Sequence, residues 1–153
     1  MKDPGLDLEN FLPYRLSILS NTISGAIAEA YSTEFGLSIP EWRVIAVLAR
    51  YPGSSAGQVA TRTAMDKVAV SRAVSRLRDA GRVDREFADA DRRRSILSLS
   101  QTGRDIYHRI APVLLDYEAE LLGGLSTTDR RHLGRILGRL VEQARRLGPP
   151  SLD

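Results

Sequence analysis

The sequence contains no cysteine, only two histidines, and no apolar run long enough to span a membrane. The absence of cysteine excludes disulfides, thiolate metal sites and redox sensing through a thiol. The histidines, His108 and His132, lie in no cluster spaced for metal ligands, so we expect neither a metal ion nor another cofactor. The first five residues lack the apolar core of a signal peptide. We therefore expect a cytoplasmic protein that does not bind membranes.

Sequence patterns typical of enzymes are also missing. The chain has no glycine-rich phosphate loop, no nucleophile elbow and no catalytic constellation around a histidine. Asp89 and Asp91 resemble a pair of catalytic carboxylates, but both would stay ionised beside three arginines and would be poor acids. The sequence therefore predicts a protein that is not an enzyme.

The 153 residues suit one compact domain, and a hydrophobic content of 42% is enough for a core. The net charge of +3 says little about partners, but the positive charge is unevenly distributed. Residues 62–94 carry ten basic and six acidic side chains, a local charge of +4, and the rest of the chain carries −1. Such a segment is either a solvated arginine-rich surface or the electrostatic footprint of a nucleic-acid-binding site.

Helix-capping signals predict two short helices at this basic segment. Ser55 and Gln58 form a capping box that opens a helix ending near Thr63. After a two-residue loop, Asp66 caps a second helix that ends at Gly81. The spacing of apolar residues favours a second helix with one buried and one exposed face, so that this helix can enter a DNA groove.

The two faces of the second helix differ in composition. The residues expected to pack inward are Val70, Ala73, Val74 and Leu77. The residues expected to face outward are Val68, Ser71, Arg72, Ser75, Arg76 and Asp79.

Two alternating runs, 83–87 and 95–99, follow the helix pair and predict a β-hairpin. The turn between them is strongly charged and consists of Asp89, Ala90, Asp91, Arg92, Arg93 and Arg94. A helix pair followed by a basic hairpin is the layout of a winged helix-turn-helix, whose wing reaches the DNA backbone or minor groove. We therefore predict a protein that binds double-stranded DNA.

A further helix is predicted before the helix pair. Ser38 and Glu41 form a capping box, with Pro40 in the first turn, and the helix continues to Arg50. The residues expected on its core face are Trp42, Ile45, Ala46 and either Leu48 or Ala49.

Three long amphipathic helices are predicted near the ends of the chain. The first covers about 8–34, the second follows residues 100–103 and carries apolar residues from Ile106 to Leu122 with a kink at Pro112, and the third is capped by Ser126 and carries apolar residues as far as Leu147. The central segment can cover only part of their apolar faces. We therefore expect a homodimer in which 1–36 and 101–153 form the dimerisation helices and 37–100 the DNA-binding lobe. A monomer that folds these helices into one bundle is the alternative.

Several motifs of this sequence occur together in one known family. They are Glu41-Trp42-Arg43-Val44-Ile45, Arg62-Thr63 followed by Met65-Asp66-Lys67, Val70-Ser71-Arg72-Ala73-Val74-Ser75-Arg76-Leu77, Asp91-Arg92-Arg93-Arg94 and Thr102-Gly103-Arg104. From about Leu8 to Leu147 the chain resembles the MarR family of bacterial transcriptional regulators. The resemblance implies a mainly α winged-helix homodimer with a two-stranded wing. It also implies a regulator, usually a repressor, that leaves its operator when a small molecule binds between the dimer helices and the DNA-binding lobe.

The second helix of the pair supplies most of the predicted DNA contacts. Ser71, Arg72, Ser75 and Arg76 are expected at base edges or nearby phosphates, with Arg72 the preferred base reader. Lys67 is expected to contact a phosphate, and Val68 a thymine methyl group. Two-fold symmetry then predicts an inverted-repeat operator with half-sites one helical turn apart. An architectural DNA-binding protein without a ligand response is the alternative function.

The wing is expected to add contacts from Asp91, Arg92, Arg93 and Arg94. Alternate side chains of a hairpin point in different directions, so one arginine is expected to enter the minor groove. The resemblance associates Asp91 and Arg93 with the wing tip, where the carboxylate would orient an arginine. A purely structural salt bridge of Asp91 across the wing is the alternative.

The resemblance implies that the first two helices approach the small-molecule pocket of the family, and each of them carries an aromatic residue beside an arginine. Tyr14 precedes Arg15, and Trp42 precedes Arg43. Aromatic walls with a guanidinium group suit a phenolic or aromatic carboxylate effector. In the alternative interpretation, Trp42 belongs to the core and both arginines pair with surface carboxylates.

Overall fold

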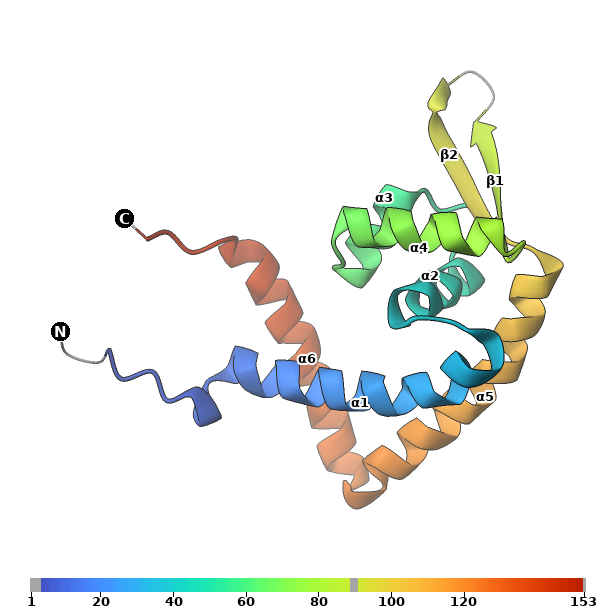
Figure 1. Cartoon of the computed structure of the whole chain (residues 1–153). Helices are drawn as coiled ribbons and strands as arrows, with labels where there is room; N and C mark the ends of the chain where they lie inside the picture. The colour runs from blue at the N-terminus through green and yellow to red at the C-terminus, as the bar shows by residue number, and fades with distance from the viewer. Residues whose placement is uncertain (1–3, 89–90, 153) are drawn as a thin grey trace. The chain divides into compact units, whose positions relative to one another are not determined.

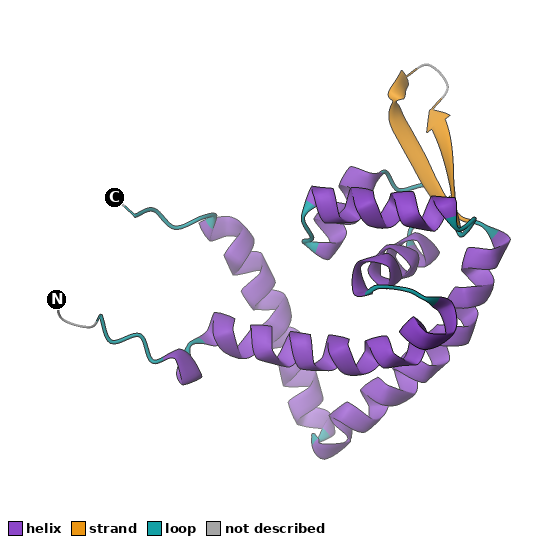
Figure 2. Cartoon of the chain, in the orientation of Figure 1, coloured by secondary structure: helices purple, strands orange, loops and turns teal. Residues whose placement is uncertain are grey.

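The structure is a computed structural model that describes residues 4–88 and 91–152, and of residues 88 and 91–94 the backbone alone (Figure 1). The described residues form mainly helices and a two-stranded antiparallel sheet, which confirms the predicted fold class (Figure 2). The elements are η1 (Leu8–Asn10), α1 (Leu12–Phe35), α2 (Ile39–Arg50), α3 (Ala56–Thr63), α4 (Lys67–Asp79), β1 (Val83–Ala88), β2 (Asp91–Leu99), α5 (Gln101–Leu121), η2 (Leu122–Gly124) and α6 (Thr127–Leu147). The chain divides into two compact units, Met1–Leu114 and Leu115–Asp153, which are described separately below.

The first helix begins later than its apolar pattern predicts. The short turn η1 occupies Leu8–Asn10, Phe11 is extended, and α1 starts at Leu12. The reason is Pro13, which lacks an N–H donor and is tolerated in the first turn of a helix but not in its interior. At the other end, Gly36 adopts the left-handed conformation and terminates α1 as predicted, donating its N–H to the Ser32 carbonyl.

The helix pair forms as its capping residues predict. At the start of α3, Ser55 and Gln58 make both bonds of the capping box. Ala64 adopts a left-handed conformation with φ of 53° and ends that helix. The Asp66 carboxylate then accepts from the Ala69 N–H and caps α4. Local side-chain chemistry therefore fixes the sharp turn between the two helices.

The core of the first unit lies between α2, α3, α4, the sheet and the first turns of α5. On α4 the buried residues are Val70, Ala73, Val74 and Leu77, as predicted. On α2 the buried residues are Glu41, Val44, Ile45 and Leu48, which follow the helical spacing of three and four. The prediction for α2 was therefore right for Ile45 and Leu48, but it missed Val44 and included Trp42 and Ala46, which are only half-buried.

The wing consists of β1 and β2, which pair antiparallel with Val83 opposite Leu99 and Arg85 opposite Leu97. Both strands extend further toward the tip than the alternating pattern predicts. Ser54 also pairs with Leu97, through a bond from the Leu97 N–H to the Ser54 carbonyl. The turn between α2 and α3 is therefore joined to the base of the wing.

Gly103 allows α5 to pack against the segment that follows α4. A Cβ atom at this position would lie 2.2 Å from the carbonyl oxygen of Arg82, closer than any side chain tolerates. Arg82 in turn accepts from the Ser100 N–H just before the helix. The helix α5 then buries Ile106 and Ile110 and continues through Pro112 into the second unit.

The second unit contains the end of α5, η2 and α6, the last of which begins at its predicted cap, Ser126. No residue of α6 is buried. Its large apolar side chains are between 37% and 72% exposed, and they are Leu133, Ile136, Leu137, Leu140, Val141 and Leu147. Within the part of the chain that the structure describes, no helix is long and apolar enough to cross a bilayer.

Candidate nucleic-acid interface

The exposed face of α4 carries the side chains that the sequence predicts for DNA contact. Ser71, Arg72, Ser75 and Arg76 are all exposed, because the opposite face of the helix packs into the core. Val68, at the first turn, is 55% exposed although it is apolar. An exposed aliphatic side chain between cationic residues suits contact with a thymine methyl group. The structure therefore collects these residues on one surface of the first unit.

Two cations of this surface are available for a ligand. Lys67 is the first residue of α4, where the helix macrodipole adds positive potential. Arg72 lies one and a half turns further along. Among the described residues, neither Lys67 nor Arg72 makes a hydrogen bond or an ion pair. Their charges are therefore not neutralised within the described part of the chain.

Arg76 differs from its neighbours because it faces a buried carboxylate. Its guanidinium Nη1 lies 3.9 Å from Oε1 of Glu41, whose side chain is 10% exposed. The same carboxylate accepts a 3.0 Å bond from the hydroxyl of Ser38. Because the Arg76 side chain is 68% exposed, the ion pair is weak. It nevertheless connects the exposed face of α4, called the recognition face below, to the first turn of α2.

The sequence predicted a capping box at Ser38, but in the structure the Glu41 side chain does not make the bond that a capping box requires. The Ser38 hydroxyl accepts from the Glu41 N–H as expected. The carboxylate of Glu41, however, accepts from that same hydroxyl and faces Arg76. A Ser-x-x-Glu pattern alone does not reveal this arrangement, since the arginine comes from a helix 35 residues away in the chain.

The structure describes the strands of the wing but not the side chains near its tip. Asp91, Arg92, Arg93 and Arg94 lie in β2, but their side chains fall outside the described part. Asp89 lies outside it entirely. The contacts predicted for these residues therefore stay predictions.

The residues predicted for a small-molecule site form two separate pairs. Tyr14 and Arg15 are exposed near the start of α1. Arg43 instead donates a 3.2 Å bond to the hydroxyl of Ser24, ten residues beyond Tyr14 on the same helix, or about 15 Å along its axis. Among the described residues, no hydrogen bond, ion pair or ring contact joins Tyr14 or Arg15 to Trp42 or Arg43.

Trp42 is the centre of an aromatic stack. Its ring lies 5.6 Å from the centroid of Tyr31 and 6.0 Å from that of Tyr107. Burial raises the pKa of the Tyr31 hydroxyl, and the positive charge of Arg43 acts in the opposite direction. The stack joins α1, α2 and α5 in the first unit.

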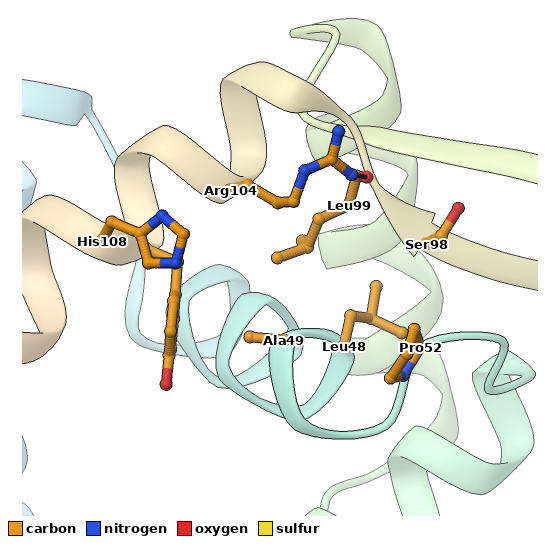
Figure 3. A pocket seen from close by; sticks show the side chains of 8 residues that line it. Leu48, Ala49, Pro52, Ser98, Leu99, Arg104 and His108 are labelled. Atoms are coloured by element: carbon orange, nitrogen blue, oxygen red, sulfur yellow. Dashed lines mark hydrogen bonds between the residues drawn. The ribbon is translucent and has the colours of Figure 1, made fainter.

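A small cleft of about 200 Å³ lies beside this stack, between the end of α2, the end of β2 and the start of α5 (Figure 3). Its wall includes Leu48, Leu99, Arg104, Tyr107 and His108. The Arg104 guanidinium donates to the Leu99 carbonyl and to the Gln101 side chain, so part of its donor capacity is already used. The cleft is smaller than the roughly 300 Å³ at which drug-sized sites begin.

A helix pair with an exposed arginine face and an adjoining hairpin defines a winged helix-turn-helix DNA-binding protein. Residues 35–94, which contain the helix pair and most of the hairpin, match the sequence model of the MarR family. Together with the relatives described next, this match shows that the chain is similar to the MarR family of transcriptional regulators.

The relatives cover nearly the whole chain. The transcriptional activatory protein BadR from Rhodopseudomonas palustris is 26% identical over 95% of this chain and 85% of its own length. An HTH-type transcriptional repressor from Mycobacterium tuberculosis is 27% identical over 85% of this chain and 91% of its own length. A solved MarR/EmrR family regulator from Acinetobacter sp. ADP1 superposes with a TM-score of 0.85 at 23% identity, covering 92% of this chain and 99% of the other.

Proposed function

We propose that this chain is a homodimeric transcriptional repressor that binds an inverted-repeat operator and releases it when a small organic anion binds. The observation that carries this proposal is the exposed face of α4, where Lys67 and Arg72 have no partner among the described residues. An arginine on such a face can make a bidentate contact with guanine O6 and N7. A regulator needs that contact to tell its operator from other DNA.

The apolar surface of α6 supports the homodimer. Leaving six large apolar side chains this exposed is unfavourable, and a symmetric contact with a second copy is the commonest way to cover them. Exposed apolar residues also line α1, among them Leu12, Leu16 and Leu19. We therefore assign residues 1–36 and 101–153 to dimerisation and 37–100 to DNA binding.

The operator follows from the symmetry of such a dimer. Two copies of α4 related by a two-fold axis enter successive major grooves, so the half-sites are inverted and lie about one helical turn apart. The FabT protein of Streptococcus pneumoniae, solved in complex with DNA, supports this proposal as a fold neighbour with a TM-score of 0.72 and 22% identity, covering 93% of this chain and 100% of the other.

Repression and ligand release are supported by relatives rather than by a single residue. The mycobacterial relative is named a repressor, whereas BadR is named an activatory protein. Among fold neighbours, PcaV from Streptomyces coelicolor was solved with its natural ligand, and DNA binding by Bordetella bronchiseptica BpsR is regulated by 6-hydroxynicotinic acid. We assign Tyr14, Arg15, Trp42 and Arg43 as the residues to test for an aromatic acid or phenolic effector.

A binding experiment tests the proposal. Fluorescence anisotropy should show strong preference of the protein for an inverted repeat from the DNA flanking its gene over a scrambled duplex at fixed salt. Equal affinity for both duplexes would favour the architectural alternative. Titration with hydroxybenzoates and hydroxycinnamates should then release the operator, and Arg15→Gln or Arg43→Gln should blunt this response without weakening DNA binding. A panel that gives neither binding heat nor release would contradict the effector class.

A further inference from the structure

Two arginines contact one tyrosine ring at the junction of α2 and α3. The guanidinium carbon of Arg62 lies 3.6 Å from the centroid of the Tyr51 ring, and that of Arg50 lies 5.0 Å from it. Tyr51 is 38% exposed, and both arginines are exposed. These three residues, called the Tyr51 cluster below, therefore hold two cationic groups at the surface of the first unit.

The backbone around the Tyr51 cluster is fixed on both sides. The Tyr51 N–H donates to the Val47 carbonyl of α2, and the Ser54 hydroxyl donates to the carbonyl of Tyr51. The next residues are bonded to the wing, because Gly53 donates to the Leu97 carbonyl and Leu97 donates to that of Ser54. The ring is therefore held by a turn with little freedom to move.

The charge of the Tyr51 cluster is not neutralised within the described part of the chain. No hydrogen bond or ion pair of Arg50 or Arg62 occurs among the described residues. Arg109 provides the contrast, because its guanidinium lies 4.9 Å from the Phe35 centroid and is also paired with the carboxylate of Glu34. Among the described residues, the arginine on the Phe35 ring therefore has a carboxylate partner, whereas the two arginines on the Tyr51 ring have none.

The position of the Tyr51 cluster in the fold indicates which kind of anion it could bind. The helix α3 is the first helix of the pair (Figure 1). In helix-turn-helix proteins this first helix crosses the DNA backbone when the second enters the major groove. The cluster also adjoins the base of the wing through the Ser54 to Leu97 pairing. A planar guanidinium that a ring holds in place loses little freedom when it binds a phosphate oxygen pair.

We propose that the Tyr51 cluster binds a phosphodiester group of the operator backbone, with Arg62 as the principal contact and Tyr51 as the residue that positions it. This inference rests on the proposed DNA-binding function. It adds a contact made by α2 and α3, outside the recognition face of α4 and outside the wing tip.

The test measures operator affinity of the full-length chain as a function of salt concentration. In a plot of the logarithm of the affinity against the logarithm of the salt concentration, each phosphate contact contributes a slope of about −0.9. Removing one contact from each subunit of a dimer should therefore make the slope shallower by about 1.8. Arg62→Ala should therefore have a shallower slope and bind about tenfold more weakly at about 0.1 M salt, equally for operator and scrambled DNA. Arg109→Ala is the matched control, because it removes one charge and one ring contact at a site that is already neutralised.

Variants of the ring separate positioning from charge. Tyr51→Phe keeps the ring and should bind like the wild type. Tyr51→Ser keeps both arginines, so it should weaken binding by a few fold while it leaves the salt slope nearly unchanged. Thermal unfolding of each variant shows whether the fold is retained.

The outcomes distinguish this inference from the function on which it rests. A wild-type protein with no preference for its operator would overturn the proposed function and the inference with it. A selective wild-type protein whose Arg62→Ala variant keeps the same affinity and slope would overturn the inference alone. A loss of affinity with an unchanged slope, matched by a lower unfolding temperature, would assign Arg62 a structural role and would also overturn it.

Discussion

The helices α4 and α6 have similar amphipathic patterns, but the apolar face of α4 is buried and that of α6 is exposed. The helix α4 buries Val70, Ala73, Val74 and Leu77 in the core of its own unit, and its polar face is exposed. The helix α6 has a comparable apolar face, but all its residues are at least partly exposed. The helix α4 is therefore supported by the core of its own unit, whereas the exposed apolar face of α6 is the surface that the proposed dimer would cover.

The largest expected effect comes from placing a charge on the apolar face of α6. Leu137→Glu should dissociate the dimer, because a buried carboxylate without a partner is strongly unfavourable, and operator affinity should fall at least about a hundredfold. Sedimentation and anisotropy measure the two effects. Thr128→Glu is the matched control, since it adds the same charge nine residues earlier, on the opposite face. A wild-type protein that sediments as a monomer at micromolar concentration would contradict the comparison.

Truncating a buried side chain of α4 should destabilise the protein in a different way. Leu77 is fully buried, so Leu77→Ala should lower the free energy of unfolding by about 2–5 kcal/mol. The loss should not depend on protein concentration, whereas that of Leu137→Ala should, because dimer stability follows mass action. Denaturant unfolding at several concentrations checks both variants. Concentration dependence for Leu77→Ala would mean that the lobe is not an independent core.

Removing the side chain expected to read bases should weaken operator binding without affecting the fold. Arg72→Ala should weaken operator binding by about 1–3 kcal/mol and relax the base preference at one position of each half-site. Arg78→Ala removes the same charge from the flank of α4 and should have a smaller effect that is similar for all sequences. Competition binding with a set of single-base operator variants measures both. An unchanged base preference in Arg72→Ala would assign that role elsewhere.

The smallest expected effect concerns the aromatic stack. Because the pKa of Tyr31 is raised in the folded protein, its contribution to stability is fully present below the ordinary value of 10.0 and is lost as the pH rises through the raised value. The wild type should therefore lose stability more steeply above about pH 10 than Tyr31→Phe does. Urea unfolding across this range checks the difference. Equal slopes for the two proteins would show that burial of the hydroxyl has no energetic consequence.

Features set by nearby residues were predictable from the sequence. The caps at Ser55, Asp66 and Ser126 were placed correctly because each bonds to a backbone N–H three residues away. The two faces of α4 were also confirmed, because helical periodicity assigns them without knowledge of the partner helices.

Features that depend on distant residues were not predictable. Glu41 is buried because Ser38 and Arg76 satisfy its carboxylate, and a charged residue gives no such signal in the sequence. The Tyr51 cluster was missed because Arg62 lies eleven positions from Tyr51, and only the turn fixed to the wing brings them together. The start of α1 was misplaced because its apolar pattern continues through Phe11, where the following proline prevents a continuous helix.

The central claim is that two identical subunits present two copies of α4 to one face of operator DNA. Hydroxyl-radical footprinting of the wild-type protein on the DNA flanking its gene tests this claim most directly. The account predicts two protected half-sites in inverted orientation, about one helical turn apart, with equal protection of each. A single protected half-site, or protection spread evenly along the DNA without preference, would contradict it.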